Sequence, residues 1–296
     1  MLDFMIIGAQ KSASTFIHRC LEEHPEVYMP QDEISVFENP DYHMEGLKKL
    51  ETIIENSNAP IKGIKRPNYL AKEECPKRIR GYSENIKLIV VLRNPVNRTI
   101  SAYYHYMRMG FLPITPLEEG IKSILNGSLS KKYQSAKDII EYGYYYKHID
   151  LYLKYFNKNQ ILVMFDEDIK MDSINTLKRV YNFLGIQNKT YIPNSLTKKP
   201  NMGMYNLNRL RINKIKNKII YKYNKTNTRL TQRSGPIINL SKILFRGIDE
   251  LVLKRIFSEK KPELSFEIKS KLYSVYEEDL NNLEKLLKIN LSHWKV

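Results

Sequence analysis

Cysteine is scarce in this sequence, and the positions of its two cysteines exclude the commonest uses of that residue. Cys20 lies on the apolar face of a predicted helix and Cys75 precedes a proline, so we expect neither a disulfide framework nor a zinc site. No apolar run has the length of a membrane span, and Asp3 stands where a signal peptide carries basic residues. We therefore expect a protein without a transmembrane segment that is made and kept in the cytoplasm.

Acidic residues are absent from one long part of the chain. Between Ser173 and Gly247 there is no Asp or Glu, whereas the same stretch contains sixteen Lys or Arg residues, which matches the formal net charge of +16. A segment whose charged residues are all positive indicates an anionic partner such as a nucleic acid, an acidic membrane surface, a polyanionic glycan or a phosphate-rich cosubstrate. The alternative is a solvated face in a protein whose composition is biased toward Lys and Asn.

The apolar runs that are present predict the fold class. With 296 residues, of which 42% are hydrophobic, the chain can bury a substantial core. Three runs are typical of strands buried in a parallel sheet, and they are Phe4–Ile7, Lys87–Leu92 and Gln160–Phe165. Because helical patterns follow each of them, we predict an α/β fold, a doubly wound parallel sheet of about four to five strands flanked by helices.

We expect one domain over residues 1–296, with an α/β core in residues 1–200 and a basic helical part in residues 201–296. Within the core the sequence predicts one long aromatic helix from Asp138 to Phe156, and another helix that ends at Gly185. Beyond the core only helical patterns remain, at roughly Leu207–Tyr223, Leu240–Phe257 and Phe266–Leu287.

The junction after the first strand has the pattern of an anion-binding loop. Small residues from Gly8 to Ala13 connect the strand to a helix that begins at Ser14, and the free N–H groups of such a helix start favour an anion. Lys11 stands inside this loop. The pattern departs from the P-loop of nucleotide triphosphatases, because Gln10 occupies the place of the glycine before the lysine. A plain strand-to-helix turn is the alternative.

A second candidate phosphate-binding element follows the strand Lys87–Leu92. Arg93 ends this strand, and the carboxyl ends of neighbouring parallel strands share a crevice, so we expect Arg93 to face the same pocket as Lys11. Ser101 lies two turns into the next helix, where a hydroxyl and an arginine fork can bind one phosphate together. Two such elements suit a nucleotide with phosphates at both ends.

Five motifs, in order along the chain, carry a resemblance to a known family. They are KSAST, DEISVF, GIKRPNYL, RNPVNRTISAYYH and LVMFDEDIKMDSINTLKRVYNFLGI, and they span roughly Phe4 to Ile186. Together they resemble the sulfotransferases that use 3'-phosphoadenosine 5'-phosphosulfate (PAPS), above all the branch that acts on heparan-type glycans and its bacterial relatives. The resemblance implies the sulfotransferase fold, which is similar to that of P-loop kinases.

The resemblance also implies a role for individual residues. Lys11 would contact the bridging oxygen of the phosphosulfate, the loop Ser12, Ala13, Ser14 and Thr15 would hold the 5'-phosphate, and Arg93 with Ser101 would hold the 3'-phosphate. Glu33 would be the general base, and Lys65 would lie near the transferred sulfuryl group. The implied products are adenosine 3',5'-bisphosphate and a sulfated hydroxyl or amine of a carbohydrate or small metabolite. No metal is required, and no set of metal ligands is evident.

Three positions depart from the family pattern. Ala13 replaces a glycine and fits if its φ stays negative, and Asp32 replaces the lysine before Glu33. The family's later Lys-Gly-Arg loop has only a loose counterpart in Lys198–Gly203, where we assign no residue.

Arg98 is expected to make a structural salt bridge, and the tyrosines from Tyr142 to Tyr146 are expected to form helix core with one or two rings in an acceptor cleft.

Other functions compete with a sulfotransferase. A nucleoside or nucleotide kinase shares the strand-loop-helix chemistry, although the imperfect P-loop tells against it. A nucleic-acid-binding protein could use the acid-free segment, but it leaves Lys11 and Arg93 unexplained, so we expect no nucleic-acid partner. For single residues the alternatives are an exposed loop carboxylate for Glu33 and a strand cap for Lys65.

Overall fold

The computed structural model describes residues 1–197, 203–257 and 260–295, which form two compact units. The first unit comprises Met1–Asn94, Tyr144–Pro200 and Asp279–Ile289, and the second comprises Pro95–Gly143, Asn201–Glu278 and Asn290–Val296. Residues 198–202, which hold most of the loose counterpart of the Lys-Gly-Arg loop, lie outside the described part. That the chain forms one domain stays a prediction.

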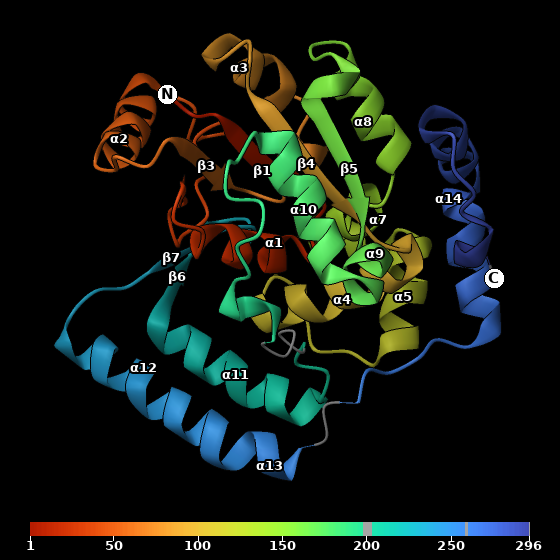
Figure 1. The fold of residues 1–296 in the computed structure, drawn as a ribbon. Coiled ribbons are helices and arrows are strands. Elements are labelled where there is room, and N and C mark those ends of the chain that lie inside the picture. Colours follow the sequence, from red (N-terminus) through yellow and green to blue (C-terminus); the bar gives the residue numbers. More distant parts are fainter. Residues whose placement is uncertain (198–202, 258–259, 296) are drawn as a thin grey trace. The chain divides into compact units, whose positions relative to one another are not determined.

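The first unit is built on a sheet of five parallel strands in the order β2-β3-β1-β4-β5, which confirms the predicted α/β fold (Figure 1). The strands are β1 Phe4–Gly8, β2 Val27–Tyr28, β3 Ile61–Lys65, β4 Lys87–Leu92 and β5 Ile161–Phe165. All five residues of β1 are buried, because helices cover both faces of a central parallel strand. The chain leaves β1 toward β2 on one side and later reaches β4 on the other, so a crevice is expected at the carboxyl end of β1.

Helices surround this sheet. They are α1 Ser14–Glu22, α2 Met44–Glu55, α3 Cys75–Tyr82, α8 Tyr145–Leu153, α9 Asp166–Met171, α10 Ser173–Leu184 and the last residues of α14 Phe266–Leu287. Ile17, Cys20 and Leu21 of α1 share one apolar core with Leu177 and Val180 of α10 and with the central strands. Cys20 is therefore a buried core thiol, and burial raises its pKa to about 12.

The second unit is mainly helical. It contains α4 Pro95–Met109, α5 Leu117–Leu125, α6 Ser128–Lys132, α7 Asp138–Glu141, α11 Leu207–Ile220, α12 Pro236–Ile248, α13 Lys254–Ile256 and the first part of α14. Its core is formed by the apolar face of α4 with Leu210 of α11 and with Ile268 and Leu272 of α14. Arg98 of α4 is fully buried and donates to the carbonyl oxygen of Ile139. The predicted salt bridge of Arg98 is wrong, since it has no carboxylate partner among the described residues.

Two predicted long helices are each broken in the structure. The helix predicted from Asp138 to Phe156 is interrupted around Gly143, where helix propensity is lowest, giving α7 and α8. The helix predicted to run to Gly185 is interrupted at Asp172, whose side chain accepts from Asn175 N at 2.9 Å and so starts α10. Gly185 does end α10, with φ of 82°.

An antiparallel hairpin of β6 Tyr221–Tyr223 and β7 Leu230–Gln232 lies in the C-terminal part, where only helices were predicted. The side chain of Asn224 accepts from the backbone N of Thr228 at 2.8 Å and of Arg229 at 3.1 Å. An asparagine that bonds nearby backbone in this way stabilises the turn between β6 and β7. Within the described ranges, no helix combines the length and apolar composition needed to cross a membrane.

Candidate functional site

The loop between β1 and α1 is held in an unusual backbone conformation. Lys11 and Ala13 have φ of 68° and 61°, in the left-handed region that costs a non-glycine residue about 1 to 2 kcal/mol. The condition that Ala13 keep a negative φ is therefore not met. Gly8 is required at the end of β1, because a Cβ there would lie 2.6 Å from Leu70 Cβ. Strain of this kind persists where the surrounding structure imposes it, as it commonly does in ligand-binding loops.

Two polar atoms of this loop have no hydrogen-bond partner among the described residues. Ser12 is completely buried, and its Oγ has no hydrogen-bond partner within the part of the chain that the structure describes. Gln10 Nε2 donates to Asn68 Oδ1 at 3.0 Å, while Gln10 Oε1 is likewise buried without a described partner. A buried unpaired polar atom costs about 1 to 3 kcal/mol. The loop is therefore suited to a polar ligand that supplies the missing hydrogen bonds.

Arg93, at the carboxyl end of β4, reaches the loop. Its Nη1 donates to the carbonyl oxygen of Lys11 at 3.2 Å, so the structure places the two predicted residues next to each other. The Nε of Arg93 lies 3.4 Å from Oδ2 of Asp166, the first residue after β5. Tyr145 Oη donates to the carbonyl oxygen of Arg93 at 2.7 Å. Asp166 was not among the predicted site residues, although its position at a strand end is the same signal that identified Arg93. Ser101 lies in the second unit, and its joint action with Arg93 stays a prediction.

Lys65, Glu33 and Thr15 form a second cluster beside the helix start. Lys65 is the last residue of β3, and its largely buried Nζ lies 3.2 Å from Glu33 Oε1 and donates to Thr15 Oγ1 at 3.2 Å. The side chain of Glu33 is 37% exposed, so solvent reaches its carboxylate. Lys65 is therefore in direct contact with two other residues, Glu33 and Thr15, that the sequence assigned to the same site from separate segments.

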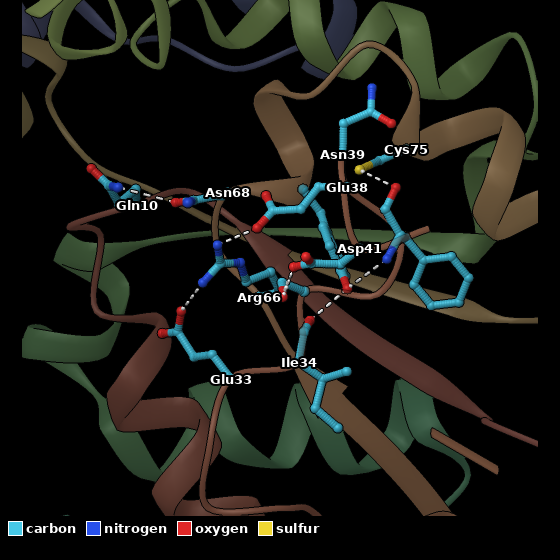
Figure 2. A network of polar contacts seen from close by, with 12 residues as sticks. Gln10, Glu33, Ile34, Glu38, Asn39, Asp41, Arg66, Asn68 and Cys75 are labelled. Atoms are coloured by element: carbon cyan, nitrogen blue, oxygen red, sulfur yellow. Dashed lines mark hydrogen bonds and ion pairs between the residues drawn. The ribbon is translucent and has the colours of Figure 1, made fainter. Parts of the chain in front are cut away.

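Arg66 and Glu38 extend this cluster on the side of Glu33, and Figure 2 shows Arg66 between the carboxylates of Glu33 and Glu38. Arg66 Nη1 lies 3.3 Å from Glu33 Oε2, and its Nη2 is paired with the buried carboxylate of Glu38. Burial acts to lower the pKa of Arg66, but the carboxylates of Glu38 and Glu33 outweigh it, so the pKa is raised. Glu33 is thus held between two cations, Lys65 and Arg66. Sequence reasoning missed Arg66 and Glu38, although Arg66 lies within the motif GIKRPNYL and Glu38 directly follows DEISVF.

His18 is a buried residue of α1 near this cluster. It is buried, and its Nε2 makes a hydrogen bond of 2.9 Å with the carbonyl oxygen of Pro30, which requires the tautomer that carries a proton on Nε2. Burial is the main reason why the pKa of His18 is lowered, and the nearby ammonium of Lys65 acts in the same direction. The hydrogen bond to Pro30 opposes these effects without cancelling them, so His18 is neutral at pH 7.

This buried histidine predicts an acid-labile fold. Because the pKa of His18 is lower in the folded than in the unfolded chain, its neutral form contributes stability above pH 6.5, and that stability is lost as the pH falls through the folded pKa. His18→Gln keeps an amide donor for Pro30 and cannot titrate. We expect the free energy of unfolding by urea to fall less between pH 7.5 and 5.0 in His18→Gln than in the unmodified protein. Equal pH dependence in the two proteins would contradict this prediction.

Within the described residues, no group of three or more His, Cys, Asp or Glu side chains is arranged to hold a metal ion. The site has instead a strained loop with buried unpaired polar atoms, an arginine at a neighbouring strand end, and a carboxylate between two cations. Such an arrangement can bind a phosphorylated ligand and place a carboxylate near it.

Comparison with known proteins identifies the family of this arrangement. The sequence model of the sulfotransferase domain matches residues 2–284. The mouse heparan sulfate glucosamine 3-O-sulfotransferase 3B1 is 31% identical over 184 residues, which are 62% of this chain and 46% of that protein. The mouse bifunctional heparan sulfate N-deacetylase/N-sulfotransferase 2 is 28% identical over 196 residues, 62% of this chain and 22% of that protein. The chain thus spans about half the length of the 3-O-sulfotransferases it matches.

A solved structure shares the fold over nearly the whole chain. The sulfotransferase from Alicyclobacillus acidocaldarius superposes with a TM-score of 0.69 and 18% sequence identity, covering 99% of this chain and 98% of that one. At that identity the match supports the architecture of the strands and helices.

Proposed function

The chain belongs to the sulfotransferase domain family, and from this premise we propose that it transfers a sulfuryl group from PAPS to a hydroxyl or amine of an acceptor. The observation that carries the proposal is the contact of Arg93 Nη1 with the carbonyl oxygen of Lys11. This contact brings together the residues that follow β1 and β4. The resemblance implies that these two segments bind the two phosphates of the cosubstrate.

The polar groups of the loop support PAPS as the cosubstrate. We propose that the backbone amides of Ser12, Ala13, Ser14 and Thr15, with the hydroxyls of Ser14 and Thr15, hold the 5'-phosphate, and that Arg93 and Ser101 hold the 3'-phosphate. The buried Ser12 Oγ, which has no partner in the described part of the chain, supports this assignment, because a phosphate oxygen nearby would satisfy it. Residues in the first turn of α1 also experience the positive end of the helix dipole, which favours an anion.

The chemistry we propose is an in-line displacement at sulfur. The bond between sulfur and the bridging phosphate oxygen breaks while a bond between sulfur and the acceptor oxygen or nitrogen forms. Lys11 stabilises the negative charge that develops on the leaving phosphate, and Lys65 stabilises charge on the sulfuryl oxygens. Glu33 accepts the proton of the acceptor, and adenosine 3',5'-bisphosphate leaves. Arg66 and Lys65 hold the Glu33 carboxylate in place from both sides.

For the acceptor we propose a carbohydrate, with a small metabolite as the alternative. Two matched relatives carry names that describe sulfation of heparan sulfate, one at a glucosamine 3-hydroxyl and one at nitrogen. Electrostatic attraction to the basic stretch from Ser173 to Gly247 would favour an anionic oligosaccharide over a neutral one.

The direct test supplies PAPS carrying a radioactive sulfur label to panels of anionic oligosaccharides, neutral oligosaccharides, small alcohols and amines. We expect label to appear in at least one class of acceptor, in proportion to the adenosine 3',5'-bisphosphate formed. If no acceptor is labelled and ATP instead donates phosphate to members of the same panels, the chain is a kinase and the proposal is wrong.

A further inference from the structure

The outermost helices of the second unit expose an apolar face that no described part of the chain covers. This face, called here the outer apolar face, is formed by α12, the π-helical segment Asp249–Leu253 that follows it and α13. Its members are Ile237, Leu240, Ile243, Leu244, Leu251 and Ile256, whose exposed fractions lie between 60% and 77%. Ile248 and Val252, at 38% and 44%, lie between them.

The sequence spacing shows that this exposure belongs to one side of the helix. Ile237, Leu240, Leu244, Ile248 and Leu251 follow one another at intervals of three or four residues, which places them on one face. Ile238, Phe245 and Leu253 lie on another side and are partly buried. None of the thirteen residues of α12 is fully buried. The helix therefore has two apolar sides, and the more apolar one faces outward.

The inner side of α12 already has its packing partner. α12 contacts α11, which lies beside it in Figure 1, and α11 contacts α4. Asn213 and Asn217 of α11 both donate to the carbonyl oxygen of Arg108 at 2.7 Å, which fixes α11 on α4. The outward side is thus not needed for packing within the unit. An exposed apolar face of this extent commonly marks an interaction surface.

The charges around the face distinguish between two possible partners, a second copy of this chain and an anionic surface. From Leu207 to Phe257 the chain has thirteen Lys or Arg residues and two Asp or Glu residues. Both acidic residues are paired within the unit, Asp249 with the buried Arg209 at 2.6 Å and Glu250 with Lys254 at 2.5 Å. A second copy would bring the same positive charge against itself, which opposes association. An anionic surface with an apolar interior complements both the charge and the face.

We propose that the outer apolar face binds the surface of an anionic lipid bilayer. α12 would lie in the plane of the interface, with Leu240, Leu244 and Leu251 among the acyl chains and with basic residues of the unit directed toward the lipid phosphates. Amphipathic helices with an apolar side and basic flanks bind membranes in this way without crossing them. This proposal is independent of the sulfotransfer reaction.

The test measures cosedimentation of the full chain with vesicles. We expect binding to vesicles of phosphatidylcholine with about 30% phosphatidylserine to be about tenfold or more tighter than to phosphatidylcholine alone, and to weaken with salt. Leu240→Glu with Leu244→Glu should reduce binding to the anionic vesicles about tenfold or more. Met171→Glu, which replaces an exposed apolar residue of the first unit, should leave binding unchanged. Both positions of the double variant are exposed, so its melting temperature should match that of the unmodified protein.

Two results would overturn the proposal. One is equal binding of the unmodified protein and the double variant to anionic vesicles, or binding by neither. The other is a dimer of the unmodified protein, measured by analytical ultracentrifugation, that the double variant converts to a monomer. The second result would assign the outer apolar face to another copy of this chain.

Discussion

Replacing Lys11 with methionine should lower kcat for sulfuryl transfer by about 10²- to 10³-fold, the usual effect of removing one group that stabilises charge in a transition state. Methionine keeps most of the apolar stem and removes only the cation. The backbone at Lys11 already has φ of 68°, which both unbranched residues tolerate to a similar extent, so we expect little change in the melting temperature. The KM for PAPS should rise less than kcat falls, because the developing charge is larger than the ground-state charge on the bridging oxygen.

The matched control is Lys154→Met, which removes an ammonium of the same unit that is 64% exposed and paired only with Asp150 in the described contacts. This control should retain normal kcat and KM. If Lys11→Met folds and transfers sulfate at the normal rate, the β1–α1 loop is a plain turn and its assigned role is wrong.

Replacing Glu33 with glutamine should reduce kcat by about 10²-fold, since general-base catalysis typically contributes about 10²- to 10⁴-fold. Glutamine has the shape of glutamate and can still contact Lys65 and Arg66, but it cannot accept the acceptor's proton. We expect binding of adenosine 3',5'-bisphosphate to Glu33→Gln, measured by calorimetry, to remain close to normal. The loss should therefore appear in the chemical step.

Glu51→Gln provides the control for this substitution, because Glu51 is an exposed residue of α2 in the same unit. A normal kcat for Glu33→Gln would show that Glu33 is an exposed loop carboxylate that merely pairs with Lys65. In that case another group must take the proton, and the proposed mechanism would lose its base.

The sheet could be predicted from the sequence because its central strands are covered on both faces. The sequences of such strands are continuous apolar runs, and Lys87–Leu92 gives the strongest strand signal among them. The same logic placed Lys11 and Arg93 at neighbouring strand ends, where the structure joins them. Local signals failed where a single side chain redirects the backbone, as Asp172 does between α9 and α10 and Asn224 does in the β6–β7 hairpin.

The finer structure of the site could not be predicted, because it depends on contacts between distant loops. Glu38 and Arg66 are far apart in sequence, and only the folded loop pairs them beside Glu33. Asp166 reaches Arg93 because β5 lies next to β4, which periodicity alone does not show. The positive φ of Ala13 likewise follows from how the loop is held between β1 and α1.

The measurement that most directly tests the central claim is the melting temperature of the full chain with adenosine 3',5'-bisphosphate, adenosine 5'-monophosphate, ADP or ATP. At a concentration about 100 times its Kd, a ligand that binds only the native state contributes about 2.7 kcal/mol, which raises Tm by about 4 °C for a chain of this size. We expect this rise with the bisphosphate alone. A rise with ATP and none with the bisphosphate would contradict the assignment of Lys11, Arg93 and Ser101 to a PAPS site.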